Sequence, residues 1–116
     1  MLDDLDDSAL DALPYGVVCL GVSASDEMTV LRMNRTESER SGIQRWRAIG
    51  RDFFRDVAPG EPNRALAEEV RAFASGATDD HAVPHVFRRR AGSDPTTIEL
   101  AHGRDDRRVY LKIRRA

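Results

Sequence analysis

The spacing of apolar residues in this chain changes from a strand pattern to a helical pattern and back again. Residues 15–20 (YGVVCL) and 28–34 (MTVLRMN) are apolar and β-branched, which predicts two strands joined as a hairpin. In residues 63–75 the apolar side chains instead recur at helical spacing, which predicts a helix that ends before Gly76. The apolar face of that predicted helix carries Leu66, Val70, Phe73 and Ala74.

Three more strands are expected after the helix. Residues 81–90 form the first, and Pro84 favours an edge position or a bulge for it. Residues 96–102 and 108–114 form the other two, and the last alternates apolar with polar residues. Asp94-Pro95 and residues 103–106 are the predicted hairpin turns. This order predicts an α+β fold, with a five-stranded antiparallel sheet and one long and several short helices on one face.

The connection between the hairpin and the long helix is polar and irregular. We expect short helical turns in residues 35–44, a turn at 46–49 and one helical turn at 52–57. Trp46 is the only tryptophan. It is read as an anchor in the core, with a lid over a pocket or an interface anchor as the alternatives.

The N-terminus is acidic. Residues 1–7 are expected to be disordered, and Ser8 is the predicted cap of a short helix that ends at Leu13. We divide the chain into an acidic N-terminal segment, 1–9, and one domain, 10–116. A length of 116 residues suits one domain.

Composition excludes several classes of protein. The net charge is −2, and no basic patch with interleaved aromatic residues is present, so we expect neither nucleic acid nor a membrane as partner. The single cysteine, Cys19, allows no intrachain disulfide and reads as a small buried residue. No signal peptide or membrane span is evident, and we expect a cytoplasmic protein. The Arg88–Arg90 run reads as a solvated strand end.

Residues 49–59 (IGRDFFRDVAP) resemble the segment of photoactive yellow protein that leads to its chromophore cysteine. Residues 10–18 (LDALPYGVV), 34–42 (NRTESERSG) and 74–76 resemble other parts of the same family. The chain is therefore similar to the PAS superfamily, with photoactive yellow protein as the nearest resemblance. That resemblance implies a PAS fold and an internal cavity.

The departures from that family change what the resemblance implies. Gly60 stands where the family has cysteine, so a thioester to a coumaroyl chromophore is excluded. Met33 replaces a tyrosine of the family and Ile43 an arginine, while Glu37 aligns with a buried glutamate and Ser41 with a pocket threonine. The implied ligand-binding residues are Val18, Met33, Glu37, Ser41, Ile43, Val57, Ala58, Gly60 and Val86.

Among the implied ligand-binding residues, Glu37 is the one whose side chain can take part in proton transfer. If it lies in an apolar cavity, burial raises its carboxyl pKa, so that the neutral acid donates a hydrogen bond or a proton. The alternative is an exposed glutamate in a polar loop. The histidines His81, His85 and His102 read as surface residues, since a metal site needs further ligands nearby and none is evident.

Three functions remain open. The first is a PAS-type small-molecule-binding domain with an apolar pocket, which signals through its sheet or its N-terminal segment to a second copy or a partner protein. The second is a cofactor-free small enzyme of a biosynthetic pathway, an isomerase, dehydratase or cyclase with Glu37 as general acid or base. The third is a partner-binding domain with a collapsed pocket. No cofactor is expected for any of them.

Overall fold

The computed structural model describes residues 1–76, 82–89, 92–105 and 107–115. Within them the chain forms one five-stranded antiparallel sheet in the order β2-β1-β5-β4-β3. The strands are β1 (Gly16–Val22), β2 (Met28–Met33), β3 (Ala82–Arg89), β4 (Gly92–His102) and β5 (Arg108–Arg115). The predicted α+β fold class with a five-stranded antiparallel sheet is confirmed, but the helices do not all lie on one face, because η1 and α1 pack on the other face.

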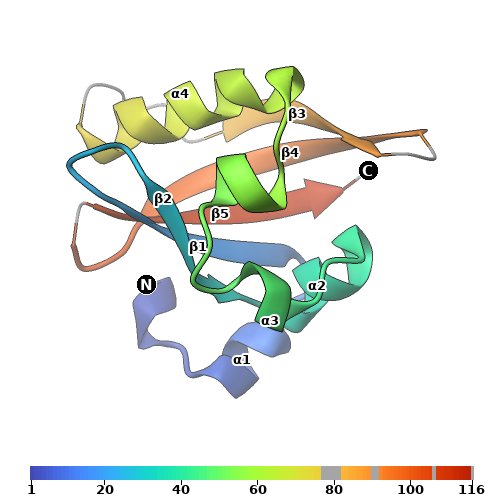
Figure 1. Cartoon of the computed structure of the whole chain (residues 1–116). Coiled ribbons are helices and arrows are strands. Elements are labelled where there is room, and N and C mark those ends of the chain that lie inside the picture. Colours follow the sequence, from blue (N-terminus) through green and yellow to red (C-terminus); the bar gives the residue numbers. More distant parts are fainter. Residues whose placement is uncertain (77–81, 90–91, 106, 116) are drawn as a thin grey trace.

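The helices are short except for one. They are η1 (Leu2–Asp4), α1 (Asp7–Asp11), α2 (Arg35–Ser41), α3 (Arg45–Ala48), η2 (Phe53–Val57), η3 (Glu61–Asn63) and α4 (Arg64–Ala74). The apolar face predicted for the long helix is buried against the sheet, as expected. In Figure 1, α4 lies on one side of the sheet and α1 on the other.

The main core lies between the inner face of the sheet and the helices that follow β2. Alternate residues of the strands point into it, as a period of two requires, except at a bulge in β2 between Val30 and Met33. Its buried members from the strands include Val18, Leu20, Val30, Ile98, Leu100, Val109, Leu111 and Ile113, and α4 adds Leu66, Val70, Phe73 and Ala74. None of the helices in the described part of the chain is both long and apolar enough to cross a membrane.

The expectation that residues 1–7 are disordered is wrong. Residues 1–13, here called the N-terminal segment, pack on the outer face of the sheet, where Leu2, Leu5, Leu10 and Leu13 meet Val17, Cys19 and Tyr110. The cap of α1 is Asp6 and not Ser8, because the Asp6 carboxylate accepts a hydrogen bond from the Ala9 amide. Leucines spaced between the aspartates thus give the segment an apolar face.

The turn predicted at Asp94-Pro95 is also wrong, because both residues lie within β4, where Pro95 is paired with Val86 of β3. β5 ends opposite Thr96, so Pro95 lies where β4 has only one neighbouring strand. A residue without an N–H is tolerated at such a place. The edge position predicted from Pro84 is confirmed, since β3 is an edge strand.

One buried side chain ties the N-terminal segment to the sheet and to α2. Asn34 is fully buried, and its Oδ1 accepts hydrogen bonds from the amides of Val17 and Glu37 at 2.9 and 3.0 Å. Its Nδ2 donates to the carbonyl oxygens of Leu10 and Tyr15 at 2.9 and 3.0 Å. Asn34 is therefore the N-cap of α2 and also a junction of three elements.

Candidate functional site

The nine residues expected to line one cavity occupy different environments. Val18 and Met33 are buried in the main core and face each other across β1 and β2. Ser41, Ile43, Val57 and Ala58 are only half-buried, on the segment that runs in front of the sheet. Gly60 is exposed, and so is Val86, whose side chain is 44% accessible on the outer face of β3.

Glu37 is buried, as the resemblance implied, but its surroundings are charged. Its Oε1 and Oε2 accept hydrogen bonds from the two terminal nitrogens of Arg115, at 2.6 and 3.1 Å. The Nε of Arg115 also donates to Asp94 at 2.7 Å. Only 6% of the Glu37 side chain and 11% of the Arg115 side chain are accessible to solvent. The expectation of a carboxyl in purely apolar surroundings is therefore wrong.

This ion pair changes what Glu37 can do. Hydrogen bonds from a guanidinium favour the ionised carboxylate over the neutral acid. On the arginine, burial lowers the pKa, but the bonds to Glu37 and Asp94 outweigh it and raise the pKa overall. The inward position of Arg115 could have been predicted from the alternation along β5, because Arg115 lies on the same face of the sheet as the buried Ile113.

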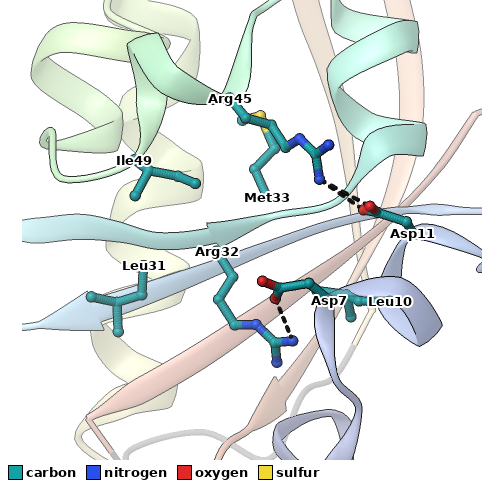
Figure 2. A pocket seen from close by; sticks show the side chains of 8 residues that line it. All are labelled: Asp7, Leu10, Asp11, Leu31, Arg32, Met33, Arg45 and Ile49. Carbon is teal, nitrogen blue, oxygen red and sulfur yellow. Dashed lines mark hydrogen bonds and ion pairs between the residues drawn. The ribbon is translucent and has the colours of Figure 1, made fainter.

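A hollow with a volume of about 180 Å³ lies between α1, β2 and α3 and reaches the buried side chains of Leu10 and Met33. Figure 2 shows its lining, with Leu31 and Ile49 on one side and Arg32 and Asp7 on another. Its remaining lining residues are Leu10, Asp11, Met33 and Arg45. We call it the first hollow. Of the nine expected ligand-binding residues, only Met33 reaches it.

Two ion pairs cross the first hollow and fasten α1 to the rest of the domain. The Nη1 of Arg45 on α3 donates to both carboxylate oxygens of Asp11, at 2.9 and 3.1 Å. Arg32 on β2 donates to Asp7 at 3.2 Å, and both pairs are drawn as dashed lines in Figure 2. The N-terminal segment on the outer face is thus bonded directly to α3.

Larger hollows open at the surface, and two of them are lined by residues between 43 and 67. The second hollow, of about 410 Å³, is lined by Ile43, Trp46, Arg47, Arg51, Asp56 and Val57. The third, of about 460 Å³, is lined by Phe54, Gly60, Glu61, Asn63, Arg64 and Ala67. The structure therefore brings Ile43 and Val57 together, but it places Gly60 beside a different hollow.

The outer face of the sheet holds a polar network that sequence reasoning missed. Arg32 donates to the carbonyl oxygens of Leu2 and Leu5 and to the Tyr110 hydroxyl. The Tyr110 hydroxyl donates in turn to Asp3 at 2.6 Å. The sequence features that could have indicated this network are an arginine at an outward position of β2 and the aspartates at the N-terminus.

Cys19 lies beneath the N-terminal segment and is fully buried. Burial raises the pKa of its thiol to about 11, so the reactive thiolate is scarce while the segment stays in place. The expectation of a small buried cysteine is confirmed.

The histidines do not form a metal site in the described part of the chain, where no cluster of three potential ligands occurs. His85 shares a hydrogen bond with Asn63 at 2.8 Å, and burial lowers the pKa of its ring. His102 stacks on Phe73 with 4.1 Å between the ring centres. His81 lies outside the described residues.

Comparison with solved structures identifies the fold. The photoactive yellow protein domain of the sensor histidine kinase Ppr from Rhodospirillum centenum is 28% identical, with a TM-score of 0.76, over 97% of this chain and 95% of that one. A PAS domain of an HTR-like protein from Haloarcula marismortui is 17% identical, with a TM-score of 0.64, over 95% and 93% of the two chains.

A longer protein matches in part. The blue-light activated histidine kinase of Erythrobacter litoralis is 16% identical, with a TM-score of 0.67. The match covers 96% of this chain but only 36% of the kinase. The sequence matches no protein-family model and no curated protein sequence.

Proposed function

We propose that this chain, which has the PAS fold and resembles a photoactive yellow protein domain, is a signalling domain that binds a small apolar molecule without a covalent bond. The observation that carries the proposal is the bond from Arg45 to Asp11. It connects α3, which follows Ile43 of the implied ligand-binding wall in the chain, to the segment that covers the outer face of the sheet. A ligand that moves α3 therefore acts on that segment.

The ligand site that we propose lies between the inner face of the sheet and residues 43–60. Ile43, Val57 and Ala58 pack against the core while remaining partly exposed. Their outward movement gives an apolar molecule access to Met33 and Val18. Apolar walls with few polar groups are typical of small-molecule sites.

Covalent attachment at the position used by photoactive yellow protein is excluded. Gly60 has no thiol, and its backbone has φ = 119°, a conformation that L side chains rarely adopt. Cys19 is the only cysteine and lies on the outer face. The binding that we propose is therefore noncovalent.

The signal in this proposal is release of the N-terminal segment. Release uncovers Val17, Cys19 and Tyr110 on the sheet and offers that face to a second copy or another protein. The relatives fit this role, since the Rhodospirillum and Erythrobacter proteins are both described as histidine kinases. The enzyme alternative is not favoured, because both oxygens of Glu37 are bonded to Arg115.

Native mass spectrometry of the purified chain, combined with thiol labelling, tests the proposal. We expect the chain to retain or take up a small apolar compound, and labelling of Cys19 by an aromatic disulfide to become faster when the compound is bound. Because Cys19 is the single cysteine, the label reports on that site alone. Absence of any bound compound, or binding that leaves the labelling rate unchanged, contradicts the proposal.

The substitution Asp11→Asn should weaken the link between α1 and α3. A partly exposed ion pair contributes about 1 kcal/mol at most, so labelling of Cys19 should become up to about fivefold faster without ligand. Asp56→Asn, which removes the ion pair between Arg55 and Asp56, is the matched control and should not change the rate. Equal rates in Asp11→Asn and the unmodified chain argue against the link.

Acid should loosen the same segment. Burial raises the pKa of Asp3, but hydrogen bonds from Tyr110, Arg104 and Arg108 lower it by more. A lowered pKa in the folded state stabilises the docked segment above the ordinary value of about 3.9 and stops doing so as pH falls through the folded value. We therefore expect the segment to detach below about pH 4.

Two-dimensional NMR between about pH 6 and pH 2.5 measures this transition. The amides of Arg104 and Arg35 donate to Asp3 and Asp11, so both signals should move in one step as the segment leaves. The pKa of Asp11 is also lowered: burial raises it, but bonds from Arg35 and Arg45 lower it by more. Signals that stay unchanged to the acid limit contradict the prediction.

A further inference from the structure

α3 and the neighbouring part of β2 carry an unusual number of exposed apolar side chains. Trp46 is 73% accessible to solvent, Ile49 46% and Leu31 38%. They are three of the five large apolar residues that are exposed in the described part of the chain. The core position expected for Trp46 is therefore wrong, since the tryptophan points to solvent.

α3 forms a ridge between two hollows. Arg45 and Ile49, four residues apart, line the first hollow with Leu31. Trp46 and Arg47 line the second hollow with Arg51. Residues on both sides of one short helix thus line open depressions, which side chains of a partner can enter. We call Leu31, Trp46, Arg47, Ile49 and Arg51 the α3 surface.

The α3 surface is positively charged, and Asp56, the carboxylate that lines the second hollow, is paired with Arg55 instead. Within the described residues, no carboxylate lies within ion-pair distance of Arg47 or Arg51, while Arg45, Arg55 and Arg32 each have an acidic partner. The guanidinium of Arg47 lies 5.4 Å from the centre of the Trp46 ring. Tryptophan and arginine together are the residue types enriched at the energetic centres of protein interfaces.

From these observations we infer that the α3 surface binds an acidic protein segment that also carries apolar side chains. The carboxylates pair with Arg47 and Arg51, and the apolar side chains cover Trp46 and enter the second hollow beside Ile43 and Val57. Charge selects an acidic partner over a basic one. The exposed apolar area selects a protein segment over a purely anionic molecule such as polyphosphate. This surface is separate from the outer sheet face, and it adjoins the proposed ligand site, since Ile43 and Val57 also line the second hollow.

Titration of the intact chain with a short synthetic peptide, in which glutamates alternate with leucines, tests the inference. Trp46 is the only tryptophan, so its fluorescence reports directly on the α3 surface. We expect a shift of the emission to shorter wavelength, and binding that weakens as salt increases. A peptide with lysines in place of the glutamates should give no shift.

Variants separate the contributions to this binding. With a labelled peptide, fluorescence anisotropy should show about 30-fold weaker binding for Trp46→Ala, the loss expected of an interface hot spot. Arg47→Gln and Arg51→Gln should each weaken binding about fivefold. Arg71→Gln on α4, which lies far from α3 in Figure 1, is the matched control and should bind as the unmodified chain does.

Three outcomes overturn the inference. One is an unchanged Trp46 emission with the acidic peptide. Another is equal binding of a peptide of glutamates and serines without leucines, or of a single-stranded DNA, which makes the surface a general anion site. The third is equal loss of binding in Arg71→Gln. Circular dichroism of each variant separates loss of binding from loss of folding.

Discussion

Replacing Asn34 with alanine should reduce the free energy of unfolding by about 3 to 5 kcal/mol. Loss of the N-cap of α2 accounts for about 1 kcal/mol. The remaining loss arises because the Val17 amide and the carbonyl oxygens of Leu10 and Tyr15 lose a buried partner, at about 1 kcal/mol or more each. The total free energy of unfolding of a domain of this size is only about 5 to 15 kcal/mol.

Urea denaturation followed by circular dichroism measures the effect. Asp6→Ala is the matched control, because Asp6 is also an N-cap but is exposed and makes one hydrogen bond to the Ala9 amide. We expect the control variant to lose about 1 kcal/mol or less of its free energy of unfolding. If the two variants lose similar stability, Asn34 is an ordinary cap and the junction that we describe is unimportant.

The second large effect concerns the buried ion pair. Arg115→Met should lower the free energy of unfolding by about 3 kcal/mol, because the carboxylate of Glu37 stays buried without its guanidinium partner. Asp94 loses its contact with Arg115 in the same variant. The double variant Glu37→Gln/Arg115→Met should recover part of the loss, since an amide is cheaper to bury than an unpaired charge.

A double-mutant cycle over these variants gives the coupling energy of Glu37 and Arg115. We expect about 1.5 kcal/mol or more, in line with residues in direct contact. Coupling near zero means that the carboxyl does not depend on Arg115, and the earlier interpretation of Glu37 as a neutral acid in apolar surroundings regains its basis. Lys112→Met, which removes a more exposed ion pair to Glu99, is the matched control.

Most of the strands and the long helix could be predicted from the sequence because their signals are local. The apolar face of α4 repeats at helical spacing, and Val109, Leu111 and Ile113 alternate along β5. The hairpin of β1 and β2 follows from β-branched runs with a polar turn between them. These periods are set by backbone geometry and need no knowledge of distant contacts.

The candidate site was much less predictable. The alignment with a family implied which residues lie near Glu37, but it did not place Arg115, which is 78 positions away in the sequence. The packing of the N-terminal segment could not be predicted for the same reason. Its leucines look isolated among aspartates until the outer face of the sheet gives them a surface to cover.

The sequence by itself determined the order of the strands and the long helix, the alternation along β5, and the absence of a chromophore cysteine at Gly60. Only the tertiary structure decided which charges meet, because pairs such as Glu37–Arg115 and Asp11–Arg45 form between segments that the sheet brings together. It also decided that Trp46 faces solvent. Hydrophobicity alone favours burial of a tryptophan, and a surface position becomes visible only once the core is seen to be filled by other side chains.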